Sequence, residues 1–92
     1  MLNVQTDTTV TSEYRYYFID PLSAGMDINI TLPSDTSLEG IPITFKRVSS
    51  TFDIYFLGSY TFEGAALPQI LLTTSLDSFT IILNGSNWNI VD

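Results

Sequence analysis

The chain has 92 residues, the size of one small domain, and we assign residues 1–92 to a single domain. Its 45% hydrophobic and 14% charged residues exclude a disordered chain and leave few charges for the surface. The formal charge of -7, with only Arg15, Lys46 and Arg47 basic, argues against nucleic acid or an anionic membrane as partner. The absence of cysteine and histidine excludes disulfides, thiol and serine–histidine catalysis and ordinary zinc sites. Composition therefore favours a binding or structural module over an enzyme, with no catalytic residue, no metal and no cofactor.

The dominant sequence period is two, and strand-favouring residues fill it. We predict a weak strand over residues 8–11 and further strands over residues 14–19, 27–32, 41–48, 52–57, 60–63, 69–74, 78–83 and 87–91. Turn residues separate these segments, and Asn84 with Gly85 is the strongest hairpin signal because both tolerate positive φ. Residues 34–40 are expected as a loop or 3₁₀ turn. The pattern predicts an all-β fold, a compact antiparallel β-sandwich or barrel-like domain of about eight short strands.

Some predicted strands carry apolar residues on both faces. Tyr55 and Leu57 lie opposite the apolar face of their strand, and Ile82 lies opposite the apolar face of a later one. A monomeric sandwich would place polar groups there. Scattered surface hydrophobes are the alternative explanation. With so few charges, we favour an oligomer interface that contains these three residues.

Several short motifs follow one another along the chain in a set order. A strand ends in Leu-Pro, a polar segment ends in Gly, and a strand ends in a basic residue and Val. An aromatic strand then closes on Glu-Gly, and a hairpin leads into Asn-Gly-Ser-Asn-Trp. These motifs occupy residues 30–33, 39–40, 43–48, 62–64, 79–83 and 84–90. In this order the chain resembles a module at the distal ends of phage tail fibres and tailspikes, and of fibre-like proteins of other viruses.

The resemblance covers nearly the whole chain, because residues 14–19 with Asp20 are similar to the opening strand of that module. Two departures are present. Residues 49–51 lack the usual Gly or Asn turn pair, and Asn84 stands where Asp is frequent. The resemblance implies a homotrimeric, non-enzymatic head or cap at a virion fibre or tail tip, which binds a host-surface glycan or protein receptor. The alternative is a purely structural trimerisation cap without receptor binding.

The short loops over residues 34–40, 49–51 and 65–68 tilt the comparison slightly toward the structural alternative, because long variable loops normally carry recognition. The expected location is the virion. The chain shows no secretion signal, and no apolar run reaches the length of about 18 residues that a membrane span needs. We therefore expect no membrane insertion.

Three groups of side chains are candidates for function. The candidate ligand-facing residues are Tyr14, Tyr16, Tyr17, Tyr55 and Tyr60, since tyrosine offers rigid contact area and a hydroxyl; core packing is the alternative for most of them. Trp88 is expected as a buried packing anchor rather than a sugar platform. The acids Asp20, Asp35 and Asp77 occur in turns and are expected to accept hydrogen bonds from their own backbone.

Overall fold

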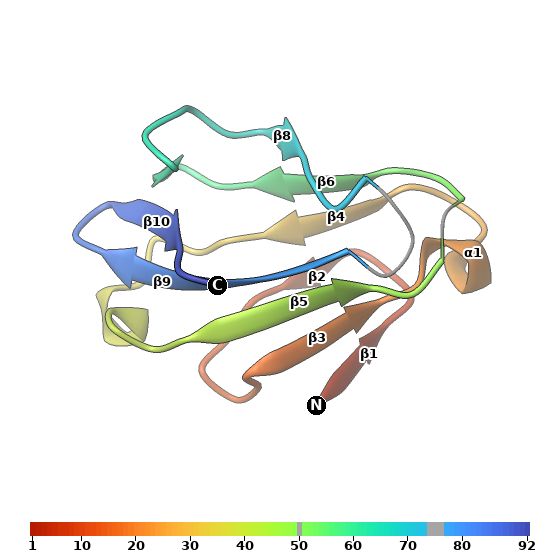
Figure 1. Cartoon of the computed structure of the whole chain (residues 1–92), viewed down its shortest axis with the longest axis horizontal. Helices are drawn as coiled ribbons and strands as arrows, with labels where there is room; N and C mark the ends of the chain where they lie inside the picture. The colour runs from red at the N-terminus through yellow and green to blue at the C-terminus, as the bar shows by residue number, and fades with distance from the viewer. Residues whose placement is uncertain (50, 74–76) are drawn as a thin grey trace.

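The computed structural model describes residues 1–49, 51–73 and 77–92, and ten strands, one short α-helix and one 3₁₀ turn lie within these ranges. One sheet has six strands in the order β1 (Leu2–Val4), β3 (Tyr16–Ile19), β5 (Ile43–Arg47), β9 (Ser78–Asn84), β10 (Asn87–Ile90) and β7 (Thr61–Phe62). The other has four strands in the order β2 (Thr8–Thr9), β4 (Ile28–Thr31), β6 (Ile54–Leu57) and β8 (Gln69–Ile70). Figure 1 shows β4, β6 and β8 on one side and β1, β3 and β5 on the other.

The chain alternates between the two sheets from β1 to β9, so that each strand lies in the sheet opposite to its predecessor. Because the chain reverses direction each time it crosses between the sheets, two successive strands of the same sheet run in the same direction. For this reason β1, β3 and β5 pair in parallel, as do β2, β4 and β6. Antiparallel pairs join β9 to β5 and to β10, and join β6 to β8.

The prediction of an antiparallel all-β sandwich or barrel is therefore wrong: both sheets are mixed, and a little helix accompanies them. The predicted strands over residues 41–48 and 52–57 illustrate the cause. They follow each other closely in the chain with turn residues between them, yet β5 lies in one sheet and β6 in the other. A turn sequence specifies that the chain reverses, but not which strand it pairs with afterwards. Residue 50 and residues 74–76 lie outside the described ranges.

The hairpin at Asn84 and Gly85 is confirmed. Strand β9 pairs antiparallel with β10, Asn84 stands opposite Asn87, and Gly85 has a φ of 67°. The period-two pattern of residues 27–32 is also confirmed, because β4 buries Ile28 and Ile30. Strand β1 was not predicted.

The core lies between the sheets and is built from their inward-facing residues and from residues of the connecting segments. Its fully buried members include Tyr17, Ile19, Ile28, Ile30, Leu32, Leu38, Ile43, Phe45, Ile54, Phe56, Phe62, Ile81, Leu83 and Trp88. Phe45 is central among the aromatic rings, with its centroid 5.3 Å from that of Tyr17, 5.2 Å from Phe56 and 5.9 Å from Phe79. Such pairs contribute beyond their buried area.

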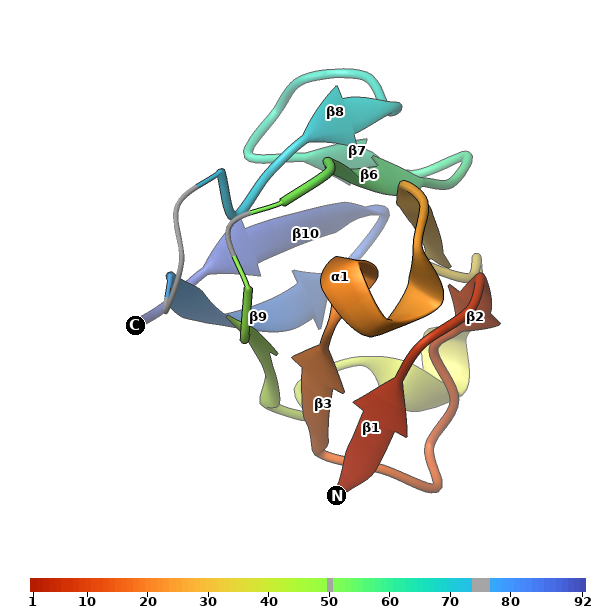
Figure 2. The same cartoon turned by 90° about the vertical axis from the view of Figure 1, so that its right-hand side faces the viewer.

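Helix α1 (Pro21–Ala24) covers one end of the molecule, which faces the viewer in Figure 2. Asp20 caps its first turn, Pro21 supplies a preset φ, and Gly25 ends it with a φ of 74°. A 3₁₀ turn, η1 (Thr36–Leu38), lies at the opposite end and is capped by Asp35. It falls inside the residues predicted as a loop or 3₁₀ turn.

Candidate binding surfaces

The structure does not gather the five candidate tyrosines. Tyr17 is buried in the core, and its hydroxyl oxygen accepts a hydrogen bond from the Thr11 N–H at 3.0 Å. Tyr14 precedes β3 and packs its ring edge-to-face on Tyr17, with the centroids 6.1 Å apart. Tyr60 is also half-buried against the core.

Tyr16 and Tyr55 point outward, but from opposite sheets. Tyr16 is 54% exposed on β3, where alternation places it on the face opposite Tyr17. Tyr55 is half-buried on β6, between the buried residues Ile54 and Phe56. The two tyrosines therefore belong to two separate surfaces.

The outer surface of the six-stranded sheet combines aromatic and polar side chains. We call Tyr16, Phe18, Thr44, Lys46 and Thr80 the polar face. Tyr16 stands opposite Thr44, which stands opposite Thr80, and the two threonine hydroxyls are 2.8 Å apart. Phe18 stands opposite Lys46 in the next row. Aromatic rings thus lie beside hydroxyls and one cation on the outer surface of this sheet, where Tyr16 is exposed and the other four residues are half-buried.

The outer surface of the four-stranded sheet carries three apolar or aromatic side chains beside Asn29 and Thr31. We call Tyr55, Leu57 and Ile70 the apolar face. Tyr55 stands directly opposite Ile70, which is 46% exposed, and Leu57 stands opposite Thr31.

Ile82 is not part of the apolar face. It lies on β9 between buried Ile81 and Leu83, which places its side chain on the outer surface of the six-stranded sheet, opposite Asn89. Of the three candidate interface residues, the structure brings together Tyr55 and Leu57 and separates Ile82 from them.

Most of the acidic side chains accept hydrogen bonds from backbone N–H groups. Asp20 accepts from Ser23 and Asp35 from Ser37, as predicted. Across longer separations, Glu39 accepts from Gly85 at 2.8 Å and Glu63 from Ile90 at 3.0 Å. These carboxylates fasten turns and strand ends.

Two of these carboxyls have altered acidity. The hydroxyl and backbone N–H of Ser23 hold the pKa of Asp20 below its ordinary value of 3.8, and Ser37 does the same for the pKa of Asp35. Asp77 is the third acid expected in a turn. Its backbone carbonyl accepts a hydrogen bond from the Arg47 N–H at 2.8 Å.

Arg47 is a buried cation that the sequence analysis did not single out. Its guanidinium donates to the carbonyls of Leu72 and Thr51, both at 2.9 Å, and to those of Ser49 and Phe52. Leu72 and Phe52 both have positive φ, at 56° and 70°. The guanidinium thus holds two strained backbone segments, one that precedes β6 and one that follows β8.

Trp88 is fully buried on β10, which is the position that a packing anchor requires. Its Nε1–H has no acceptor within the described residues. An unpaired buried donor is costly, so the apolar contacts of the indole outweigh that cost.

The described residues contain no pocket and no group of three side chains suited to a metal ion. Among them, no helix is long and apolar enough to cross a membrane. Comparison with protein-family models, curated proteins and solved structures finds no match for this chain.

Proposed function

We propose that this chain is a non-enzymatic module of a virion fibre or tail tip and that it serves in host attachment. The order of its short motifs, from the Leu-Pro strand end to the final Asn-Gly-Ser-Asn-Trp, supports the class. In this proposal the chain forms a homotrimer whose outer surface binds a host-surface glycan or protein.

The observation that carries this proposal is the polar face. Tyr16 is 54% exposed and stands opposite Thr44, whose hydroxyl lies 2.8 Å from that of Thr80 on the next strand. An aromatic ring packs against the apolar face of a sugar, and neighbouring hydroxyls satisfy the hydroxyls of the sugar. Extended sheet surfaces of this kind suit a glycan without an enclosing pocket.

Binding of the 92-residue chain to a glycan array and to host cells tests the proposal. Tyr16→Ala removes the exposed ring without opening the core and should abolish binding, whereas Leu22→Ala, on α1 and outside both sheet faces, should preserve it. Equal binding by the two variants would place recognition elsewhere, and a chain that binds neither glycans nor cells would contradict the attachment function.

The apolar face favours a second candidate function, a structural trimerisation cap. Tyr55, Leu57 and Ile70 form an outward apolar surface that association would cover. A chain that forms trimers but binds neither glycans nor host cells would support this candidate over attachment.

A further inference from the structure

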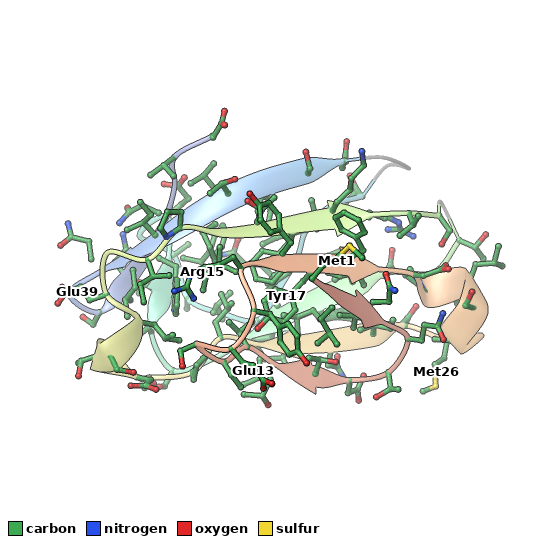
Figure 3. All side chains as sticks on the ribbon, turned by 90° about the horizontal axis from the view of Figure 1, so that it is seen from below. Met1, Glu13, Arg15, Tyr17, Met26 and Glu39 are labelled. Atoms are coloured by element: carbon green, nitrogen blue, oxygen red, sulfur yellow. The ribbon has the colours of Figure 1, made fainter. Side chains whose placement is uncertain are left out.

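The end of the molecule that carries α1 exposes four large apolar side chains. We call Leu22, Met26, Val48 and Phe52 the end patch; they are 57%, 50%, 47% and 41% exposed. They belong neither to the polar face nor to the apolar face. Figure 2 looks onto this end, and Figure 3 shows Met26 projecting outward beside α1.

Hydrogen bonds hold the contributing segments together although they are far apart in sequence. The backbone N–H of Leu22 donates to Oγ of Ser49 at 3.2 Å, which joins α1 to the segment after β5. The N–H of Asp53 donates to Oδ1 of Asp27 at 2.8 Å, and the carbonyl of Asp53 accepts from Ile28 at 3.1 Å. The four apolar side chains therefore share one end of the fold.

Phe52 is held in an unfavourable conformation at this end. A bulky residue with a φ of 70° is strained, and its ring is exposed to water as well. The conformation persists because the buried guanidinium of Arg47 binds the carbonyls of Thr51 and Phe52. Strain of this kind concentrates at sites that contact a ligand.

The charge around the end patch is negative. Asp27 and Asp53 adjoin Met26 and Phe52 in the chain, and Asp20 caps the helix that carries Leu22. Two copies meeting through this end would bring these carboxylates together, which costs free energy.

Cations are scarce on the same segments. The segments that carry the end patch have two cations, both near the end of β5. Arg47 is buried, and Lys46 is half-buried. An apolar surface with an acidic rim fits a partner whose apolar surface has a basic rim. We propose that the end patch docks a protein segment whose apolar side chains are flanked by Lys or Arg.

Three labelled synthetic peptides of equal length test this docking on the full chain: alternating Leu and Lys, alternating Leu and Glu, and alternating Ser and Lys. We expect the Leu–Lys peptide to bind and the other two to fail, and we expect added salt to weaken binding.

The variants keep the net charge unchanged, so they separate the patch from general attraction to an acidic protein. Phe52→Gly suits the positive φ and removes the ring, and Leu22→Ser with Met26→Ser removes two further apolar groups. Each should weaken Leu–Lys binding about tenfold or more, as loss of a contact at the centre of an interface does. Val91→Ser, at a site 53% exposed outside the patch, should change nothing.

Several results would overturn the proposal. Undiminished binding by folded patch variants would show that the peptide binds elsewhere, and equal binding of the Leu–Glu peptide would remove the role of charge. Loss of self-association in Phe52→Gly, measured by light scattering, would instead assign the patch to a second copy. Since none of these readouts involves Tyr16 or a glycan, failure here is distinct from failure of the attachment function.

Discussion

Arg47 occupies an interior position because strand alternation places it there. On β5, Ile43, Phe45 and Arg47 share the inward face, while Thr44 and Lys46 point outward. Two adjacent basic residues thus have opposite environments. The period-two pattern contained this signal, since Arg47 continues the spacing of Ile43 and Phe45, but nothing in the sequence named the carbonyls that receive its hydrogen bonds.

Arg47→Met is expected to destabilise the fold substantially. It retains apolar volume but leaves buried carbonyls, among them that of Leu72, without a donor, and each such loss costs about 1–3 kcal/mol. Urea unfolding measures the change in the free energy of unfolding. Lys46→Met is the matched control, expected within about 0.5 kcal/mol of the parent because Lys46 points outward. Equal effects of the two substitutions would contradict the role of the guanidinium.

Trp88→Ala should cost about 3–5 kcal/mol, as large aromatic-to-alanine changes in cores do. Calorimetry or urea unfolding measures this, and loss of folding altogether agrees with it in so small a domain. Trp88→Phe keeps most of the apolar volume and removes the unpaired Nε1–H, so it should cost much less. A Trp88→Ala variant that melts within a few degrees of the parent while losing ligand binding would favour the sugar-platform interpretation.

At the scale of elements, local sequence signals predicted the strands and hairpins that depend on residues close together in the chain. The alternation of Ile28 and Ile30 identified β4, and Asn84 with Gly85 identified the β9–β10 hairpin. Parallel pairing was missed because partners such as β3 and β5 are separated by a whole strand of the other sheet. Residues 21–24 lie between two predicted strands, and no helix is predicted there, although the Asp cap, initial Pro and final Gly of this segment are signals of a short helix.

The same reasoning applies to the candidate surfaces. Alternation along β3 places Tyr16 outside and Tyr17 in the core. The end patch was not predictable in this way, because only tertiary hydrogen bonds bring the segments that carry Leu22, Val48 and Phe52 to one end of the fold. The separation of Leu57 from Ile82 likewise required knowledge of which sheet each strand joins.

The two capping carboxylates predict loss of stability in acid. Because the pKa of Asp20 and that of Asp35 lie below 3.8 in the folded chain, the unfolded chain takes up protons first as the pH falls. Their contribution is full above the unfolded pKa and is lost as the pH falls through the folded pKa. The double variant Asp20→Asn and Asp35→Asn keeps a capping oxygen but cannot titrate. Between about pH 6 and about pH 3 its melting temperature should fall less than that of the parent. An identical fall in melting temperature for the variant and the parent would contradict a role of these two carboxylates in acid sensitivity.

At the scale of the whole molecule, the surface favours association through faces rather than edges. The four edge strands β1, β2, β7 and β8 have only two or three residues each. Short edges offer few unpaired backbone groups to another chain, and they limit edge-to-edge aggregation. The faces are longer, and that of the four-stranded sheet carries Tyr55, Leu57 and Ile70.

Association through the apolar face predicts an oligomer whose assembly is sensitive to substitution of Leu57. Light scattering at micromolar concentration should give three times 10.3 kDa; the number three follows from the resemblance to viral fibre modules, and the apolar face requires only self-association. Leu57→Lys places a charge beside Tyr55 and should weaken assembly more than it lowers the melting temperature of the isolated fold.

Ile82→Lys is the matched control for this prediction. It introduces the same charge on the other sheet, opposite Asn89, and should leave the trimer intact. A trimer lost in Ile82→Lys but kept in Leu57→Lys would move the interface to the polar face and would contradict its use for glycan binding. A soluble monomer in the parent would contradict both the apolar interface and the fibre assignment, whereas a stable dimer would retain the interface and exclude the fibre head.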